Sequence, residues 1–450
     1  MAVLVHKGVF RTLLSMAVPM LAGTFAMNAY NLTDTWFVSR LGTLPLAAMG
    51  FTFPVVMLLT AVAMGIASGI TPLVSHAIGR HDHQDAAKLV THGMLFIGSV
   101  TVLISIAGYL LITPIFTKLG ADHETLPLVG QYMRIWYIGA VFMAMPMFGN
   151  GMLLSMGDSK TAARFMMLGT ILNLILDPIM IFGYLGFPAM GIRGAAIATV
   201  IAQAVATAWL VYLLCKKHHL ILLRGWGLKD CAASLRRIVS FAIPGVLSMI
   251  LMPISATVIT KLLSHFGNTT IAAIGVITRL EMFAFMIPMA MGISLVPFVS
   301  QNFGAEQFGR VRRAWKLSTS FAIGYGALMT LFFFIGAHWL ASLFTDDPKV
   351  AATIEMYTRI VPIGYGMMEV HRYSSLFLTG LHKPTFSAIL NCIRVLVLLI
   401  PLSYLGAHFG AVSGVFNGRL ATDFIAGAIG LICVSGVMRG YKSNLEPSGS

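Results

Sequence analysis

Long apolar runs alternate with short polar connections along the whole chain. Eight runs contain no Lys, Arg, Asp or Glu: 12–33, 41–79, 89–117, 194–215, 238–260, 282–305, 317–345 and 395–418. Shorter apolar runs, interrupted by one or two charges, lie near 135–157, 165–184, 356–380 and 424–438. A membrane-spanning helix needs roughly 20 mostly apolar residues. The pattern therefore predicts about twelve spanning helices, over 9–37, 47–75, 89–113, 128–155, 162–184, 191–215, 235–264, 274–301, 314–340, 353–379, 385–405 and 410–436.

The composition agrees with this pattern. The hydrophobic fraction is 57%, the charged fraction is 10% and the mean hydropathy is +0.85, whereas about a quarter of the residues of a soluble domain are charged. The apolar runs are continuous rather than alternating, which argues against a membrane β-barrel. The first run is long enough to stay as a helix, so no cleaved signal peptide is expected. The predicted fold class is an all-α integral membrane protein.

The net charge is +14, and the basic residues are distributed unevenly between alternate connections. Counting Lys and Arg over alternate connections gives 19 on one side of the membrane and 4 on the other. Cytoplasmic connections carry such an excess, so both termini are predicted to be cytoplasmic. The basic residues are then expected to set the orientation of the chain in the membrane and to attract anionic lipid headgroups. We therefore expect no nucleic-acid partner.

The sequence repeats itself at an offset of half its length. Residues 15–79 and 240–304 share 16 identities in 65 positions without a gap. The matches include turn and breaker residues: Pro19 with Pro244, and Gly42 with Gly267. Apolar composition alone does not align prolines and glycines.

The repeat predicts the domain organisation. Six spans per repeat place both halves in the membrane with the same orientation, as two parallel six-helix bundles related by a pseudo-two-fold axis along the membrane normal. The expected parts are an N-terminal lobe (1–215), a cytoplasmic linker (216–237), a C-terminal lobe (238–440) and a flexible tail (441–450). Duplication of this kind suits a transporter that opens alternately to the two sides of the membrane.

No catalytic or metal-binding motif stands out. Cys215, Cys231, Cys392 and Cys433 have no metal-type spacing and none lies in a predicted outer loop, so neither a disulfide framework nor a metal site is expected. We predict that the chain is not an enzyme and needs no cofactor.

Ionisable residues inside spans carry the functional signal, because burying a charge there costs several kcal/mol. The predicted spans contain five acids: Asp34, Asp177, Glu281, Glu369 and Asp423. By sequence spacing, Glu369 can pair with Arg372, and Asp423 with Arg419, within one helical turn, whereas Arg279 is close to Glu281 but not on its helical face. For these acids structural and functional roles both stay open, and Glu281 and Glu369 are secondary candidates for cation coupling.

Asp34 and Asp177 have no such neighbours. No basic residue lies within five positions of Asp34 or within twelve of Asp177. Both are predicted at about 9–10 Å below the outer surface, each with a polar residue four positions earlier, Tyr30 or Asn173. The repeat mate of Asp34 is the apolar Ile259. Isolated carboxyl groups in a span are suited to binding H⁺ or Na⁺. The alternative is that each acid satisfies a neighbouring donor or pairs with Arg134.

Two prolines mark places where these helices can open. Pro178 follows Asp177 directly and frees a carbonyl one turn earlier, which supplies backbone oxygen for a small cation. Pro19 lies about four helical turns before Asp34, where the first helix can bend. Its repeat mate Pro244 leaves open a purely architectural role.

These features resemble the multidrug and toxic compound extrusion (MATE) family. The resemblance rests on two six-helix halves and on the pattern Pro-x-Val-Ser-x-x-x-Gly at 72–79 and 297–304, the latter followed by Ala305. The run from Asn173 to Gly183 is similar to the family's fifth helix, and the run from Gly191 to Thr199 to the start of its sixth. The resemblance covers nearly the whole chain.

The acids of the first half are similar to those of the family's DinF-like branch. This resemblance implies a cation-coupling site at Asp34, Asn173, Asp177 and Thr199, and cavity-lining roles for Tyr30, Tyr132 and Asn150. The branch with a glutamate in helix seven differs, since residues 240–260 contain no acid.

The resemblance further implies the function: a monomeric antiporter in a bacterial or archaeal cytoplasmic membrane. It would export cationic or amphipathic compounds by alternating access, in exchange for H⁺ or Na⁺. A lipid-linked precursor or oligosaccharide flippase of the same superfamily is the alternative, because Lys261, Arg279 and Arg394 are among several basic residues in or near spans.

Overall fold

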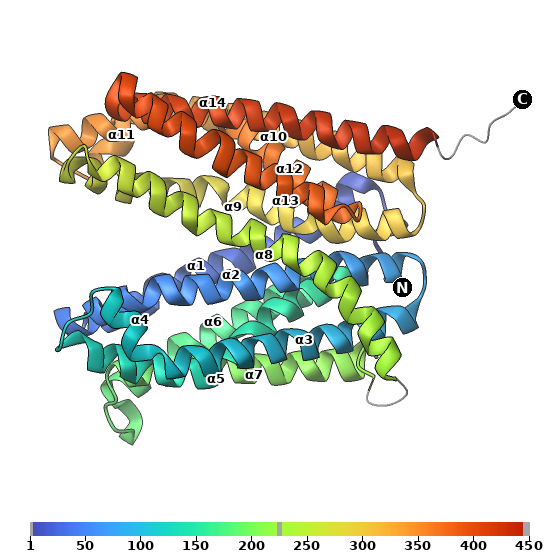
Figure 1. Ribbon diagram of the computed structural model, residues 1–450, viewed down its shortest axis with the longest axis horizontal. Helices are drawn as coiled ribbons and strands as arrows, with labels where there is room; N and C mark the ends of the chain where they lie inside the picture. Colours follow the sequence, from blue (N-terminus) through green and yellow to red (C-terminus); the bar gives the residue numbers. More distant parts are fainter. Residues whose placement is uncertain (1–2, 223–226, 444–450) are drawn as a thin grey trace, which may run out of the picture. The chain divides into compact units, whose positions relative to one another are not determined.

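The structure is a computed structural model that describes residues 3–222 and 227–443. Within this described part every regular element is a helix (Figure 1). The long helices are α1 (Val9–Ser39), α2 (Thr43–Gly79), α3 (His83–Leu110), α5 (Thr125–Ser155), α6 (Ser159–Phe182), α7 (Ile192–Tyr212), α8 (Leu228–Ser264), α9 (Asn268–Gly304), α10 (Phe308–Ser342), α11 (Pro348–Ile360), α12 (Tyr365–Gly380) and α14 (Ile400–Ser443). Shorter elements are η1 (Val3–Val5), α4 (Ile112–Lys118), η2 (Tyr184–Gly186), η3 (Leu213–Lys217), η4 (Val361–Gly364), α13 (Pro384–Cys392) and η5 (Ile393–Leu399).

The predicted number of spanning helices is confirmed once two interruptions are taken into account. In the described part of the chain, ten continuous helical stretches are long and apolar enough to cross a membrane. One of them, Pro384–Tyr441, has 58 residues, about 87 Å of helix, and non-helical backbone at Gly410 and Ala411 divides it into two spans. The tenth predicted span is broken into α11 and α12 by the turn Val361–Gly364, where Pro362 lies. The short helix α4 follows the third span and was not predicted.

The chain divides into two compact units, one of Met1–Leu4 with Ser15–Val246 and one of Val5–Leu14 with Leu247–Ser450. It passes between them within α1 and within α8. The division at Val246 lies inside α8, beyond the predicted linker (216–237), and η3 and the start of α8 occupy parts of that linker. The predicted tail lies outside the described residues from 444 onward, while α14 continues to Ser443.

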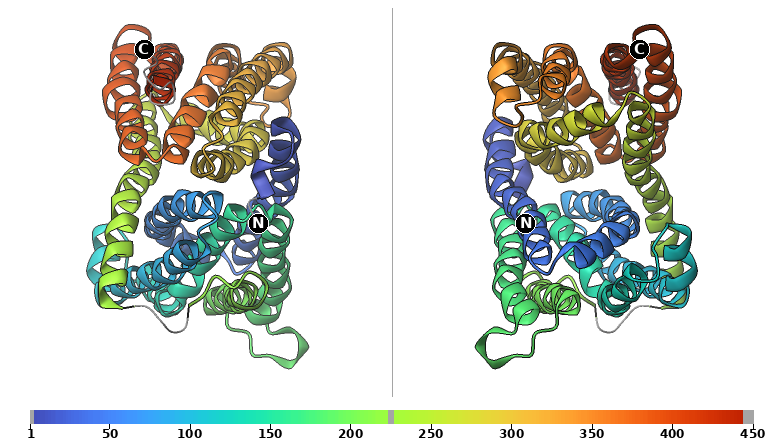
Figure 2. Two further views of the ribbon diagram at one scale, coloured as in Figure 1. Left: turned by 90° about the vertical axis from the view of Figure 1, so that its right-hand side faces the viewer. Right: turned by 90° about the vertical axis from the view of Figure 1, so that its left-hand side faces the viewer.

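Each unit is built around one central helix. In the first unit α5 packs against α2, α3, α6 and α7, and Figure 2 shows these helices nearly end-on. In the second unit α12 packs against α9, α10, α13 and α14. The half-length offset maps the first set onto the second up to the fifth helix, so the sequence repeat is also a packing repeat.

Backbone conformation follows the same repeat. Three pairs of positions related by the half-length offset have a positive φ in both halves: Gly42 (112°) and Gly267 (100°), His81 (60°) and Glu306 (56°), Gly157 (77°) and His382 (61°). Residues with side chains rarely adopt such angles. The turns that join the helices therefore have the same geometry in both halves.

After the fifth helix of each half, the offset that relates the two halves is a few residues shorter than half the chain length. This shorter offset aligns Gly191 with Ala411. Gly191 (φ 55°, ψ −133°) and Ala411 (φ 48°, ψ −130°) have the same unusual conformation before the sixth helix. Three positions later, a Cβ on Gly194 would lie 2.2 Å from the carbonyl oxygen of Met180, and one on Gly414 would lie 1.8 Å from that of Gly406. The loop of the first half is the longer one and projects sideways from its helices (Figure 2).

Neighbouring hydroxyl groups compensate for the prolines inside the helices. A proline leaves the carbonyl four residues earlier without its helical donor. Ser159 donates to the Ser15 carbonyl freed by Pro19 (3.2 Å), and Tyr325 donates to the Ala284 carbonyl freed by Pro288 (2.7 Å). Where water is absent such partners are required, so these hydrogen bonds stabilise the helices that contain the prolines.

Candidate cation-coupling site

Asp34 on α1 and Asp177 on α6 lie side by side in the first unit. The two helices are parallel and in register: Ser159 donates to the Ser15 carbonyl at one level, and a Cβ on Gly23 would lie 2.9 Å from Met166 Sδ at the next. Advancing both helices by about three turns from Gly23 and Met166 brings Asp34 opposite Asp177. Their carboxyl groups are near enough for their charges to interact.

Two further polar side chains complete the cluster. The Asn173 amide Nδ2 donates to Asp177 Oδ1 (3.2 Å) and to Thr199 Oγ1 (3.2 Å), and the Thr199 hydroxyl donates to the Ala195 carbonyl (3.0 Å). All four side chains are buried, with exposed fractions of 6% or less. The structure thus brings together the four residues Asp34, Asn173, Asp177 and Thr199 that the resemblance selected.

Two carboxylate oxygens of the cluster are not used as hydrogen-bond acceptors within the described residues. Asp34 Oδ1 and Asp177 Oδ2 are buried and accept no hydrogen bond from the described residues. Neither carboxyl group takes part in an ion pair within 3–222 and 227–443. Arg134, the alternative partner, is exposed. Buried carboxylate oxygens are expected to be paired or to bind a cation, so this donor set suits H⁺ or a hard cation such as Na⁺.

The backbone of α6 adds one more oxygen at this level. Pro178 lies inside the helix and has no N–H to donate to the carbonyl of Leu174. The helix nevertheless continues to Phe182, where Gly183 ends it in a left-handed conformation. The predicted opening is therefore a missing hydrogen bond in an otherwise continuous helix.

The residues expected to line the cavity do not form one group. Tyr132 is buried in α5, in an apolar cluster with Trp136 and Ile181. Asn150 lies about five turns further along α5, roughly 27 Å away, and its Oδ1 atom is buried with no hydrogen-bond partner among the described residues. The side chain of Tyr30 lies outside the described part of the structure. Asn150 therefore belongs to the opposite end of the unit from Asp177.

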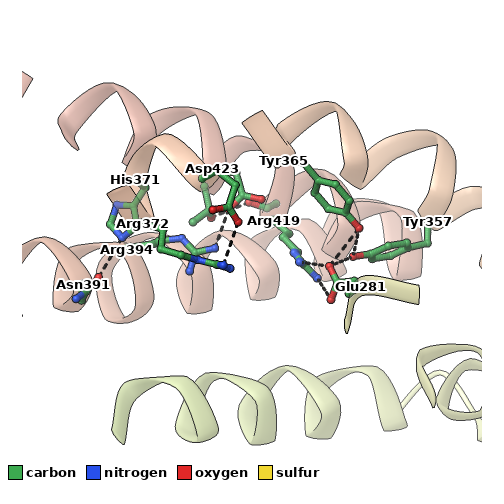
Figure 3. Close-up of polar contacts among 12 residues, drawn as sticks. Glu281, Tyr357, Tyr365, His371, Arg372, Asn391, Arg394, Arg419 and Asp423 are labelled. Carbon is green, nitrogen blue, oxygen red and sulfur yellow. Dashed lines mark hydrogen bonds and ion pairs between the residues drawn. The ribbon is translucent and has the colours of Figure 1, made fainter. Parts of the chain in front are cut away.

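Within the described residues, the acids Glu281, Glu369 and Asp423 in the spans of the second unit are all paired, and one pairing differs from that expected. Glu369 does pair with Arg372 (3.1 Å). Asp423 pairs with Arg394 (2.8 Å) rather than with Arg419, and Arg419 pairs instead with Glu281 (Figure 3). The expectation of pairing within one turn was wrong for Asp423 because a partner on another segment of the fold approaches it. His371 is buried and contacts Asn391 Oδ1 (3.2 Å).

Two tyrosines that the sequence did not single out also contact Glu281 beside Arg419. Tyr357 and Tyr365 both donate to Glu281 Oε1. The signal that could have found this cluster is the shorter repeat offset, which aligns Arg419 with Thr199. The half-length offset instead aligns Thr199 with Phe424, because the loop before the sixth helix is shorter in the second half.

Comparison with known proteins agrees with the fold and with the repeat. The profile of the family described as MatE matches twice, at residues 19–179 and 244–405, and the two matches begin half the chain length apart. A curated relative from Shewanella oneidensis, described as an FAD transporter, is 35% identical over 93% of this chain and 92% of its own length. The multidrug export protein MepA of Staphylococcus aureus is 26% identical over 94% and 93%.

A solved structure is similar along almost the whole chain. A mutant of the Vibrio cholerae MATE transporter VcmN superimposes with a TM-score of 0.91 at 30% identity, covering 96% of this chain and 97% of the other. The family profile, the relatives and the helical fold agree, and this chain belongs to the MatE family of multi-pass membrane transporters, the MATE transporters.

Proposed function

We propose that this transporter exports a small organic solute in exchange for H⁺ or Na⁺, with Asp34 and Asp177 as the coupling residues. The observation that carries the proposal is the pair of adjacent buried carboxyl groups, each with an oxygen that accepts no hydrogen bond within the described part of the chain. Two like charges without a partner are costly in a low-dielectric interior. Binding of H⁺ or Na⁺ removes that cost, so the bound and empty states of this site differ in free energy.

Coupling requires that the cation bind the inward-open and outward-open states of the transporter with different affinities. Asp34 and Asp177 lie on different helices, so a cation that bridges them favours one packing of α1 against α6. Pro19 and the Ser159–Ser15 hydrogen bond lie on the same two helices, and we propose bending of α1 there as the response. The transporter VcmN has been solved in a form described as bent, which supports this part of the proposal.

The relatives support two classes of substrate. MepA is named as a multidrug export protein, which favours cationic or amphipathic drugs. The second candidate is a flavin dinucleotide, favoured by the FAD transporter, which is 35% identical over nearly the whole chain. None of the relatives named above is described as a flippase, so that alternative gains no support. The position of both coupling acids in the first half favours the DinF-like branch.

Transport into proteoliposomes tests the proposal. We expect substrate movement to depend on an imposed pH gradient or an imposed Na⁺ gradient, and to be lost in Asp34→Asn and Asp177→Asn at wild-type protein content. FAD and a cationic dye, assayed separately, distinguish the substrate classes. Gradient-driven transport that survives in both variants would contradict the coupling role.

A further inference from the structure

Four hydrogen-bond donors of the described chain converge on one carboxylate in the second unit. Arg419 on α14 donates from Nη1 (3.4 Å to Oε2) and from Nη2 to Glu281 on α9. Tyr357 on α11 and Tyr365 on α12 donate to Glu281 Oε1, the latter at 3.3 Å. Figure 3 shows these side chains pointing toward one another from four helices. We call this group the Arg419 cluster.

The tyrosines make the donors rigid. Tyr357 and Tyr365 are 3% and 2% exposed, and each packs edge-on against a phenylalanine, Phe416 or Phe285. The Arg419 guanidinium lies over the Tyr357 ring, 5.6 Å from its centre. By contrast, the side chains of Glu281 and Arg419 keep 19% and 24% of their surface exposed. The two tyrosine donors are therefore fixed, whereas Arg419 and Glu281 are partly accessible.

The repeat relates one residue of this cluster to the cation-coupling site of the first unit. At the shorter offset that the sixth helices follow, Arg419 corresponds to Thr199. At the half-length offset, Tyr357 corresponds to Tyr132. One equivalent position in the fold thus holds the Thr199 hydroxyl of the coupling site in the first half and the Arg419 guanidinium in the second. The two sites are suited to ligands of opposite charge.

We propose that the Arg419 cluster binds a phosphate group of an anionic substrate, and that Glu281 occupies the phosphate position when no substrate is bound. This proposal rests on the flavin dinucleotide candidate and names the residues that would recognise it. A guanidinium binds carboxylate and phosphate through the same two-pronged geometry, and phenol hydroxyls donate to either. A diphosphate carries more negative charge than one carboxylate, so it competes with Glu281 for these donors.

The other arginines of this unit fit the role less well. Arg394 contacts Asp423 and Arg372 contacts Glu369, and both of these acids are fully buried. No tyrosine hydroxyl donates to either acid among the described contacts. Displacing those acids would leave a carboxylate deep in the bundle, whereas Glu281 is already partly exposed.

Flavins provide a matched series of probes for the test. Riboflavin, FMN and FAD share one ring system and carry no phosphate, one phosphate and a diphosphate. We would measure their binding to purified full-length protein in detergent by flavin fluorescence. We expect Arg419→Gln to weaken FAD and FMN binding about 10- to 100-fold and to leave riboflavin binding unchanged. Glu281→Gln removes the competitor and is expected to strengthen FAD binding without affecting riboflavin.

Two further variants keep the result interpretable. Arg359→Gln is the control, because Arg359 lies on α11 near Tyr357 but forms an exposed pair with Glu355. If Arg419→Gln does not fold, the double variant Glu281→Gln/Arg419→Gln removes both charges and avoids a buried charge without a partner. We expect it to have lost the preference for FAD over riboflavin.

The outcomes separate this proposal from the proposed function. Wild-type protein that binds none of the phosphorylated flavins overturns both the flavin candidate and the phosphate site, and leaves cation coupling to the gradient assay. FAD binding that is unchanged in Arg419→Gln and in Glu281→Gln overturns the phosphate site alone. Equal weakening of all three flavins in Glu281→Gln, with a loss of thermal stability, would identify the cluster as a structural ion pair.

Discussion

Replacement of Asp177 by asparagine removes one negative charge from the coupling site and changes little else. The Asp177 carboxyl group is buried, and its Oδ1 atom accepts from Asn173. An amide oxygen can accept the same hydrogen bond, and the amide has the same shape as the carboxyl group. The oxygen that becomes NH₂ is the one that accepts no hydrogen bond from the described residues. We therefore expect Asp177→Asn to fold.

The expected loss is in cation binding. Two unit charges about 4 Å apart attract each other by about 4 kcal/mol at the effective dielectric constant typical of proteins. Since about 1.4 kcal/mol corresponds to a tenfold change in affinity, the variant should bind Na⁺ about a thousandfold more weakly. A cation at about one hundred times its dissociation constant stabilises the wild type by about 2.7 kcal/mol, equivalent to a rise of roughly 3 °C in Tm.

Thermal unfolding in detergent, with and without Na⁺ and over a range of pH, measures this effect. The wild type should show a Tm that depends on the coupling cation, and Asp177→Asn should not. Asp158→Asn is the matched control on the same helix: Asp158 caps α6 at its other end, and asparagine caps equally well. A Tm that responds to the cation equally in the wild type and in Asp177→Asn would refute the assignment of Asp177.

Three further predictions concern helix packing and helix bending within the units. Ser159→Ala removes the hydrogen bond to the Ser15 carbonyl (3.2 Å) and should lower the free energy of unfolding by about 1 kcal/mol. Adding Pro19→Ala restores a backbone N–H that donates to the same carbonyl, so the double variant should recover that loss. If the effects of the two substitutions on stability simply add, Ser159 does not compensate for Pro19. If bending of α1 matters, Pro19→Ala alone should slow transport, whereas unchanged turnover would make the proline architectural. Gly194→Val places a side chain 2.2 Å from the Met180 carbonyl and should reduce the yield of folded protein through strain of about 1–3 kcal/mol or more, whereas Gly50→Ala, in open space, should not.

The fold was largely predictable because the membrane restricts the solutions. Long apolar runs have to be helices where no water can satisfy the backbone, and a repeated pattern of prolines and glycines requires repeated turns. Interruptions were harder to predict. The break at Val361–Gly364 and the change of conformation at Ala411 depend on local geometry inside segments that the apolar pattern alone presents as unbroken spans.

Grouping of the candidate coupling residues was predicted only in part. Sequence spacing alone relates Asn173 to Asp177, which lie one turn apart, but it does not relate either residue to Asp34 or Thr199. The parallel register of α1 and α6 and the packing of α6 on α7 bring these helices together. Their role in coupling stays a prediction.

By itself the sequence determined that this chain crosses the membrane about twelve times, in two halves with related turns, and that acids without a basic neighbour in the sequence are confined to the first half. Tertiary structure decided the partners of the other acids in the spans. Glu281 takes Arg419 and two tyrosines, and Asp423 takes Arg394. The physical reason is that a buried charge is satisfied by the nearest donor in space, and in a helical bundle that donor belongs to a neighbouring helix as often as to the next turn of its own.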